Sequence, residues 1–220
     1  MKITIKRSGG EEHFEFQVPT ADTRVVALDA LLQAADTTMP DLAYRYGCRN
    51  GLCGVCTVNI NGRPRLACRT RIKEGDEIAP MTVLPLLQDL VVRRDEVNRQ
   101  LNGRLPTVAV TGPLADKRQL DAVHSLNRCI ECYACLHKCA SHAKNPPAGP
   151  YRYGNPYSFL RIQKVCVSPY ASAAQKQQAL ALARELGIDD YDANQVPACG
   201  VGINLKTEVI QPLQALSQSS

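Results

Sequence analysis

Ten cysteines are the residues of this sequence best suited to do chemistry. Four lie between residues 48 and 68, four lie between 129 and 139, and Cys166 and Cys199 stand alone. A cysteine-free stretch, 69–128, separates the two groups. In a reducing compartment, clustered thiols are typical of metal ligands or catalytic groups rather than of disulfides. We therefore expect two modules, each with its own metal-binding task.

The first cysteine group has the spacing of an iron–sulfur loop. Its members are Cys48, Cys53, Cys56 and Cys68. Four thiolates can hold a [2Fe–2S] cluster with two ligands on each iron, and plant-type ferredoxins share the first two gaps, of four and two residues. Gly47, Gly51 and Gly54 would let the loop wrap closely around a cluster. A zinc site usually pairs two Cys-x2-Cys knuckles, and this group has one. These four cysteines are therefore predicted to bind a [2Fe–2S] cluster.

The second cysteine group is similar to the bacterial ferredoxin run that binds [4Fe–4S] clusters. Its members are Cys129, Cys132, Cys135 and Cys139. In such runs the fourth cysteine points to a different cluster, so the fourth ligand of the first cluster comes from elsewhere. Cys199 is the best candidate because Gly200 and Gly202 make its backbone flexible, and Cys139 in its place is the alternative. A zinc knuckle is a rival interpretation. So is a redox dithiol, but that motif belongs at a helix start after a strand, which is not expected here.

The first module is predicted to be two hairpins flanking one helix. The first hairpin covers residues 3–18 and turns at 8–10. The helix runs from about Thr23 to Asp36, with Asp22 or Thr23 as its cap. Its apolar face consists of Leu28, Leu31, Leu32 and Ala35. The second hairpin pairs residues 57–60 with 65–68 through the Asn61-Gly62 turn.

The second module is predicted to be mainly helical. Glycines and prolines exclude regular structure from 142–157. A helix is expected from Ser172 to Leu186, ending at Gly187. A last helix is expected between Thr207 and Ser217, which Pro212 either kinks or starts. Its buried side consists of Val209, Ile210, Leu213 and Leu216. We therefore divide the chain into a domain at 1–101, a connector at 102–118 and a second domain at 119–220.

Composition narrows the class of protein. With 45% hydrophobic and 21% charged residues, the chain can bury a core. A net charge of +5 without a long basic run gives no support for nucleic-acid binding. The N-terminus carries no apolar signal region, and residues 83–92 are too short and polar to span a bilayer. We therefore expect a cytoplasmic protein, either free or peripheral to the cytoplasmic face of a membrane.

Taken together, the pattern resembles the iron–sulfur subunit family of succinate dehydrogenase and fumarate reductase. The resemblance covers nearly the full chain. It is carried by residues 28–31, 46–54, 89–92, 120–132 and 199–204. Its most specific part is a [2Fe–2S] group followed by a cubane group.

The resemblance implies an α+β chain with a β-grasp [2Fe–2S] ferredoxin-like domain followed by an α-helical ferredoxin domain. It also implies an FAD-containing catalytic partner subunit. Electrons would then pass between the partner's flavin, the [2Fe–2S] cluster and a [4Fe–4S] cluster held by Cys129, Cys132, Cys135 and Cys199. No substrate-converting site is expected in this chain, which lacks a phosphate-binding glycine loop and a nucleophile elbow.

The sequence departs from the family at the third cluster. The family's spacing, counted back from Cys199, reaches Gln195 and Asp189 instead of cysteines. Only Cys139 and Cys166 are then left, too few thiolates for a [3Fe–4S] site, and the family's quinone pocket uses a tryptophan that this chain lacks. We therefore expect no third cluster, and a soluble or different partner at the end of the relay.

Other interpretations stay open. One is a free two-cluster ferredoxin that serves several partners, and another is the small iron–sulfur subunit of a molybdenum hydroxylase. An iron–sulfur sensor has no recognition helix to support it. His137 and His142 are expected at the surface and Cys166 in the core. A basic stripe around Cys68 is either a solvated face or a docking surface for an acidic flavoprotein. It comprises Arg63, Arg65, Arg69, Arg71 and Lys73.

Overall fold

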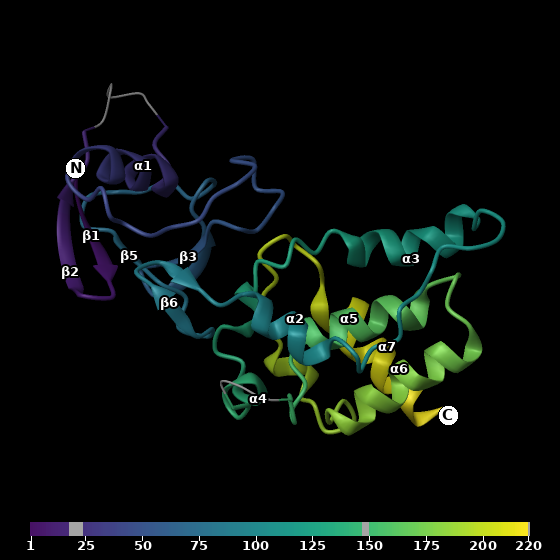
Figure 1. Ribbon diagram of the computed structural model, residues 1–220. Helices are drawn as coiled ribbons and strands as arrows, with labels where there is room; N and C mark the ends of the chain where they lie inside the picture. The colour runs from purple at the N-terminus through teal and green to yellow at the C-terminus, as the bar shows by residue number, and fades with distance from the viewer. Residues whose placement is uncertain (18–23, 147–149, 220) are drawn as a thin grey trace. The chain divides into compact units, whose positions relative to one another are not determined.

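The chain contains a mixed β-sheet that packs with one helix, α1, and a separate group of helices later in the sequence (Figure 1). The computed structural model describes residues 1–17, 24–146 and 150–219. Unit 1 comprises Met1–Arg94 and Ile130–His137, and unit 2 comprises Asp95–Cys129 and Lys138–Ser220. The α+β class is as predicted. The domain limits at 101 and 119 stay predictions about independently folding parts.

The first predicted hairpin is confirmed. Strand β1 (Lys2–Arg7) pairs antiparallel with β2 (Gly10–Glu15), and Arg7 lies opposite Gly10 across the turn. Alternating apolar residues point to one face, where Ile3, Ile5 and Phe14 are buried. Residue 18, expected at the hairpin's end, lies outside the described residues.

The second hairpin forms, but its return strand begins two residues earlier than expected. Strand β3 (Thr57–Ile60) pairs with β4 (Arg63–Leu66), and both Asn61 and Gly62 have positive φ. Such a two-residue turn places the first residue of the return strand directly after Gly62. The prediction of a strand at 65–68 was therefore wrong, and Cys68 follows β4 rather than lying on it.

The five strands of the main sheet lie in the order β2-β1-β5-β3-β4. Strand β5 (Glu77–Ala79) runs parallel to β1 and antiparallel to β3, which gives the topology of a β-grasp fold. Strands β6 (Leu86–Gln88) and β7 (Val91–Val92) form a separate two-stranded ribbon. With two or three residues each, β5 to β7 are too short to give a periodic signal in the sequence.

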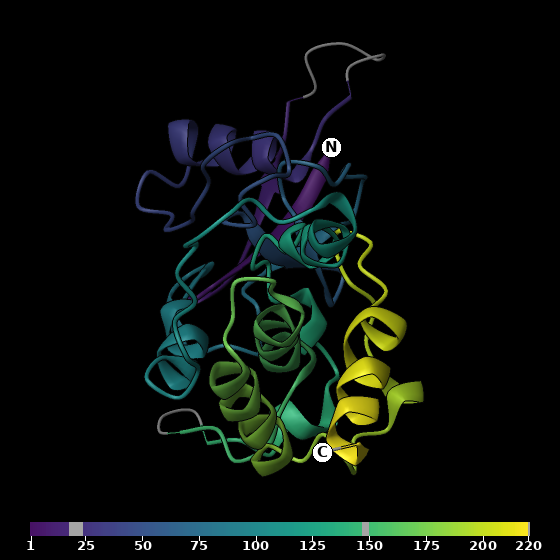
Figure 2. The same cartoon turned by 90° about the vertical axis from the view of Figure 1, so that its right-hand side faces the viewer.

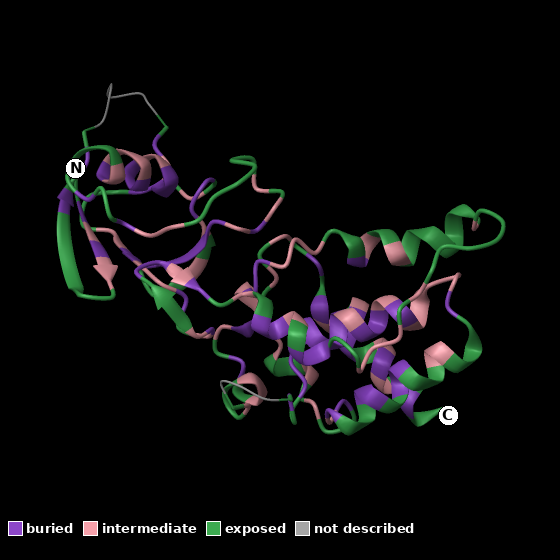
Figure 3. Cartoon of the chain, in the orientation of Figure 1, coloured by how far each residue is buried: buried purple, intermediate pink, exposed green. Residues whose placement is uncertain are grey.

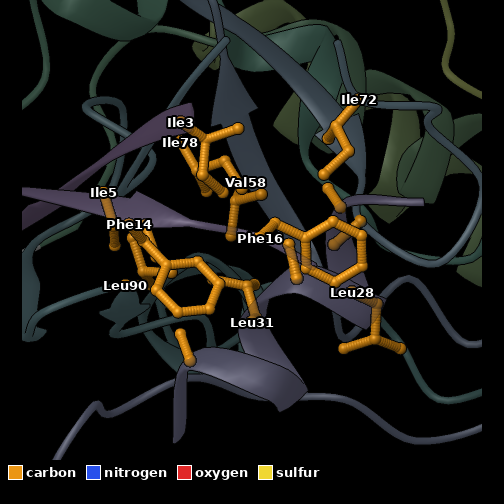
Figure 4. Close-up of a cluster of buried hydrophobic side chains, with 14 of the residues drawn as sticks. Ile3, Ile5, Phe14, Phe16, Leu28, Leu31, Val58, Ile72, Ile78 and Leu90 are labelled. Atoms are coloured by element: carbon orange, nitrogen blue, oxygen red, sulfur yellow. The ribbon is translucent and has the colours of Figure 1, made fainter. Parts of the chain in front are cut away.

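Helix α1 (Ala27–Thr37) packs on the sheet and completes the core of unit 1. Figure 4 shows Leu28 and Leu31 facing Phe14, Phe16 and Val58. Each such side chain contributes roughly 1.5–3 kcal/mol by leaving water.

The helix begins at Ala27, later than the predicted start near Thr23. The Asp29 carboxylate accepts a hydrogen bond from the Val26 backbone N–H at 3.0 Å, so the first turn is capped from within. The predicted caps Asp22 and Thr23 lie outside the described residues. Of the predicted apolar face, Leu28 and Leu31 are fully buried, whereas Leu32 and Ala35 are only half-buried.

Asp89 ties the first hairpin to the segment that leaves the sheet. Its side chain is buried and accepts hydrogen bonds from the backbone N–H groups of Ala43 at 2.9 Å and Ser8 at 3.2 Å. Arg7 Nη2 lies 3.3 Å from the same carboxylate and 2.8 Å from that of exposed Asp41. Burial acts to raise the pKa of Asp89, but these donors outweigh it and hold the pKa below its ordinary value.

Unit 2 is helical, as predicted. It contains α2 (Asp95–Leu101), α3 (Lys117–Asn127), α4 (Ala140–Ala143), α5 (Pro156–Val167), α6 (Ala173–Glu185) and α7 (Gln211–Gln218). Helix α6 packs against both α5 and α7 (Figure 2). Figure 3 shows that α3 is exposed over most of its length, and only Leu126 is fully buried on it.

Three expectations for unit 2 need correction. The stretch 142–157 is not wholly irregular, because α4 reaches Ala143 and α5 begins at Pro156, where a proline has no N–H bond to lose. The last helix is preceded by a π-helical turn, η3 (Lys206–Ile210), so that Pro212 marks the start of α7. Leu216, expected on the buried side, is 40% exposed. The helix predicted from Ser172 forms as α6, with Ser172 as its N-cap.

We predict that Asp89→Asn lowers the free energy of unfolding by roughly 3 kcal/mol at neutral pH, because Arg7 and two N–H groups lose a buried anionic partner. A carboxylate with a depressed pKa stabilises the fold above the unfolded pKa near 4, and this contribution disappears as pH falls through the folded pKa. Urea unfolding at pH 7 and pH 3 measures both effects. The control Asp41→Asn, at the exposed partner of the same arginine, should cost far less, because water and salt screen an exposed ion pair. Equal losses in the two variants would contradict this account.

Candidate iron–sulfur site

The first cysteine loop, defined as residues 47–56, connects α1 to β3 without regular structure. Cys48 and Cys53 lie within it, and Cys56 is its last residue. Cys68 follows β4, the strand paired with β3, so the second hairpin returns it toward Cys56. The fold thus brings together in unit 1 all four cysteines predicted to bind the [2Fe–2S] cluster.

Backbone N–H groups point at the two outer thiols of this loop. Cys48 Sγ accepts hydrogen bonds from the N–H groups of Leu52 at 3.2 Å and Asn50 at 3.4 Å. Cys53 Sγ accepts one from the N–H of Cys48 at 3.4 Å. The Asn50 and Leu52 donors and the neighbouring Cys53 thiol lower the pKa of Cys48 to about 7. N–H groups aimed at sulfur stabilise thiolates and the sulfurs of bound clusters.

The thiols of Cys56 and Cys68 are less accessible to solvent. Cys56 and Cys68 are both buried, and burial raises the pKa of Cys56 to about 11. The Cys68 backbone N–H acts in the opposite direction, while the Cys68 thiol raises the pKa further. A bound metal removes the proton from such a thiol outright. The four thiols therefore meet as two pairs, Cys48 with Cys53 and Cys56 with Cys68, which fits two irons with two ligands each.

The loop backbone adopts the unusual dihedrals expected of it, although not at every predicted glycine. Gly51 and Gly54 have positive φ, but the third positive φ in the loop is at Arg49 rather than at Gly47. A Cβ on Gly47 would lie 3.4 Å from Cys53 Sγ, so its role is closeness to a thiol. No group of three His, Cys, Asp or Glu side chains in the described ranges is arranged around a single metal ion.

Gly54 is where the first cysteine loop meets the second, defined as residues 130–136. A Cβ on Gly54 would lie 2.3 Å from the Ile130 carbonyl oxygen, which is a steric overlap. It would also lie 3.1 Å from the Cys132 backbone nitrogen, which is an unusually tight contact. Such distances leave no room for a side chain. The two loops of unit 1 are therefore in direct backbone contact.

The second cysteine group is divided between the units. Cys132 and Cys135 belong to unit 1, the latter within a 3₁₀ turn, η1 (Ala134–Leu136). Cys129, Cys139 and Cys199 belong to unit 2. Between these cysteines, Glu131, Tyr133 and Lys138 all have positive φ. Left-handed conformations at three non-glycine residues are costly, and they cluster where a site constrains the backbone.

The two candidates for the remaining cubane ligand differ in their surroundings. Cys139 is buried, with its Sγ 3.2 Å from Ser141 Oγ and 3.8 Å from the Tyr191 hydroxyl. Cys199 is half-buried in a turn, and its Sγ accepts a hydrogen bond from the Val201 N–H at 3.5 Å. Cys166, expected in the core, is half-buried on α5, where burial raises its pKa to about 11.

Sequence reasoning missed Arg94. Its guanidinium donates to the carbonyl oxygens of Gly54 at 2.6 Å and Val55 at 3.0 Å, and to that of Glu131 at 2.6 Å. It also lies over the Tyr133 ring, 5.2 Å from the centroid. An arginine that ligates no metal and belongs to no local motif gives no signal in the sequence, so only the folded chain identifies it.

Comparisons with known proteins relate the chain to iron–sulfur proteins. Residues 2–99 match the family described as a 2Fe-2S iron-sulfur cluster binding domain. The fumarate reductase iron–sulfur subunit of Escherichia coli is 29% identical over 160 residues, which cover 66% of each chain. One subunit of the fumarate reductase (CoM/CoB) of Methanothermobacter marburgensis is 32% identical over 154 residues, covering 67% of this chain and 31% of that protein. The matched residues thus cover between 31% and 66% of the length of these relatives.

A solved structure extends the comparison to the fold. The Mycobacterium smegmatis Sdh1 complex in the apo form contains a chain that superimposes with a TM-score of 0.83 at 24% identity, covering 99% of this chain and 95% of that one. Fold and cysteine loop together define a 2Fe-2S cluster-binding protein. More narrowly, residues 2–99 belong to the 2Fe-2S iron-sulfur cluster binding domain family, and the chain is similar over 60–66% of its length to iron–sulfur subunits of succinate dehydrogenase and fumarate reductase.

We predict that Gly54→Ala destabilises unit 1 far more than Gly62→Ala. Both glycines have positive φ, at +66° and +73°, so each substitution carries a left-handed penalty of roughly 1 kcal/mol. Only Gly54 faces backbone at 2.3 Å, whereas Gly62 has nothing within 4 Å, and the overlap should add about 1–3 kcal/mol. Urea unfolding of the full-length variants followed by circular dichroism measures the difference. Similar losses at both positions would mean that the loops separate easily.

Proposed function

We propose that this chain is the electron-transfer iron–sulfur subunit of a flavoprotein oxidoreductase of the succinate dehydrogenase and fumarate reductase type. The observation that carries the proposal is the arrangement of the first four thiols. Cys48 and Cys53 form one pair on a loop whose N–H groups point at sulfur, and Cys56 pairs with Cys68, which follows β4. In the proposal, Cys48, Cys53, Cys56 and Cys68 hold a [2Fe–2S] cluster, which when bound accepts and releases one electron at a time.

The proposal gives the second cluster, a [4Fe–4S] cubane, to Cys129, Cys132, Cys135 and Cys199. Three of these follow the ferredoxin spacing, and the left-handed residues between them support a loop shaped around a bound group. Cys199 is favoured over Cys139 because the Cys139 thiol already contacts the hydroxyls of Ser141 and Tyr191.

A third cluster has no place in the proposal. Asp189 and Gln195 stand where the family has two further cysteines, and both are exposed. An exposed carboxylate and amide are poor replacements for two thiolates, which are the soft ligands that iron–sulfur clusters use. The relay would therefore end at the cubane and pass electrons to a soluble or membrane-associated partner other than the usual quinone outlet.

The proposed partner at the other end of the relay is an FAD-containing subunit. The members of the basic stripe are all exposed, while Ala67, Cys68 and Ile72 between them are buried. The stripe comprises Arg63, Arg65, Arg69, Arg71 and Lys73. A row of cations beside a cluster ligand suits an acidic docking surface. Leu52, 68% exposed between Cys48 and Cys53, adds an apolar contact at the tip of the same loop.

The chain's relation to membranes is part of the proposal. None of the helices within residues 1–17, 24–146 and 150–219 has the length and apolarity needed to cross a bilayer. The proposed location is the cytoplasm or the cytoplasmic face of a membrane, reached through partner subunits.

Iron and acid-labile sulfide analysis after anaerobic purification tests the cluster content. We predict about six irons per chain, from one two-iron and one four-iron centre. About nine irons would show that a three-iron centre survives. Bound zinc, or two irons alone, would overturn the proposal. Stoichiometric co-purification of a flavoprotein would separate a dedicated subunit from a free two-cluster ferredoxin.

Matched alanine variants test the fourth cubane ligand. Cys199→Ala should reduce iron from about six to about two per chain, because a cubane with three thiolates is labile. Cys139→Ala removes the other candidate for the fourth ligand and should leave the iron content unchanged. The reverse result would assign the cubane to Cys139.

Arg49, next to Cys48, is predicted to raise the potential of the first cluster, because positive charge favours the reduced form. Arg49→Gln should lower the potential by tens of millivolts, the size that Coulomb's law gives for an effective dielectric constant of about 20–80. Asp29, 3.9 Å from the Arg49 guanidinium, should reduce the effect without cancelling it. A redox titration measures the shift, and Arg63→Gln at the start of β4 controls for net charge. An unchanged potential in Arg49→Gln would count against this role.

A further inference from the structure

The two cysteine loops of unit 1 touch at backbone, and one side chain bonds to both. Gly54 supplies the close approach, since even a methyl group there would overlap the Ile130 carbonyl oxygen. A contact between two irregular loops has no sheet or helix ladder to hold it. Some other group must therefore fix their relative position.

Arg94 is that group. Its Nη1 donates to the carbonyl oxygens of Gly54 and Val55, between Cys53 and Cys56. Its Nη2 donates to the carbonyl oxygen of Glu131, next to Cys132. Each terminal nitrogen of the planar guanidinium thus serves a different loop. Such a fork fits only one separation of the acceptors.

The surroundings of Arg94 make these bonds strong. Burial lowers its pKa, but arginine starts so far above neutrality that the guanidinium stays charged. Hydrogen bonds from a charged donor are worth about twice those between neutral groups. The Tyr133 ring packs on the guanidinium face and limits its rotation.

We infer that Arg94 is a positioning residue that clamps the [2Fe–2S] loop to the [4Fe–4S] loop and thereby sets the magnetic and electronic coupling between the two clusters. This inference rests on the function proposed above. Electron transfer and magnetic interaction both weaken steeply as two centres move apart. A clamp between the loop that carries Cys53 and Cys56 and the loop that carries Cys132 and Cys135 acts directly on that separation.

Arg94→Gln in the full-length protein tests the inference, with Arg93→Gln as the matched control. Arg93 is the exposed neighbour, so its substitution removes the same charge and leaves the clamp intact. Dithionite-reduced samples are compared by electron paramagnetic resonance, in which coupling broadens and splits the two signals. We expect the wild type and Arg93→Gln to show the coupled spectrum, and Arg94→Gln to show two weakly interacting signals.

Hydrogen exchange of the cluster-loaded protein gives a second measurement. Loss of the clamp should speed exchange of backbone amides in residues 51–56 and 130–133 by roughly tenfold or more, the effect of losing one charged hydrogen bond. Arg94→Lys keeps the charge but offers a single donor point, and it should restore the exchange protection of one loop only. Loss of four irons from Arg94→Gln, with the first cluster's spectrum unchanged, would be the extreme form of the same result.

The outcomes separate this inference from the function on which it rests. If the wild type contains two irons or shows no second paramagnet, the proposed function fails. If the wild type shows coupled clusters while Arg94→Gln matches Arg93→Gln in both spectrum and exchange, only the clamp is overturned.

Discussion

The approach of residue 54 to the backbone of residues 130–132 is the constraint on which the rest of the site depends. Backbone packed against backbone leaves no side chain that could adjust to a change in spacing. The first cysteine group and two members of the second, Cys132 and Cys135, are thereby joined in one unit. Arg94 donates to carbonyl groups on both sides of this contact, and the Gly54 carbonyl also accepts a hydrogen bond from Thr57 Oγ1 at 2.7 Å.

The first four thiols owe their different environments to different parts of the fold. Cys48 and Cys53 lie on an exposed loop, and their sulfurs accept hydrogen bonds from backbone N–H groups of that loop, which belong to no helix or strand. Cys56 and Cys68 lie at the ends of paired strands, where the sheet's core excludes water. One hairpin and one loop thus give two pairs of thiols in contrasting environments, one pair beside N–H donors and the other buried.

Much of this arrangement could be predicted from the sequence because its signals are local. Cysteine spacing indicated the 2Fe-2S cluster-binding module, Asn61-Gly62 indicated a turn, and Ser172 and Gly187 indicated the two ends of a helix. Strands β5 to β7 could not be predicted, because two or three residues form a strand only when a neighbouring strand is already present. Likewise, the start of α1 depends on the hydrogen bond from the Val26 N–H to the Asp29 carboxylate. The sequence alone predicts a cap near Thr23 equally well.

Arg94 shows the same limit within the site itself. Its partners are main-chain carbonyl groups at residues 54, 55 and 131, and a carbonyl group is present at every position of any sequence. No spacing rule can therefore indicate it. The left-handed conformations of Glu131 and Tyr133 could not be predicted from the sequence either, since neither residue type favours that conformation.

Unit 1 is discontinuous in the chain, and this affects the order in which it can be built. A ribosome releases residues 1–94 well before residues 130–137, so the first cysteine loop is synthesised before the segment that packs on Gly54 exists. During that interval Arg94 has neither the Glu131 carbonyl nor the Tyr133 ring beside it, and water must solvate its guanidinium. A fragment that stops near residue 100 would stay in this immature state, however well its sheet had folded.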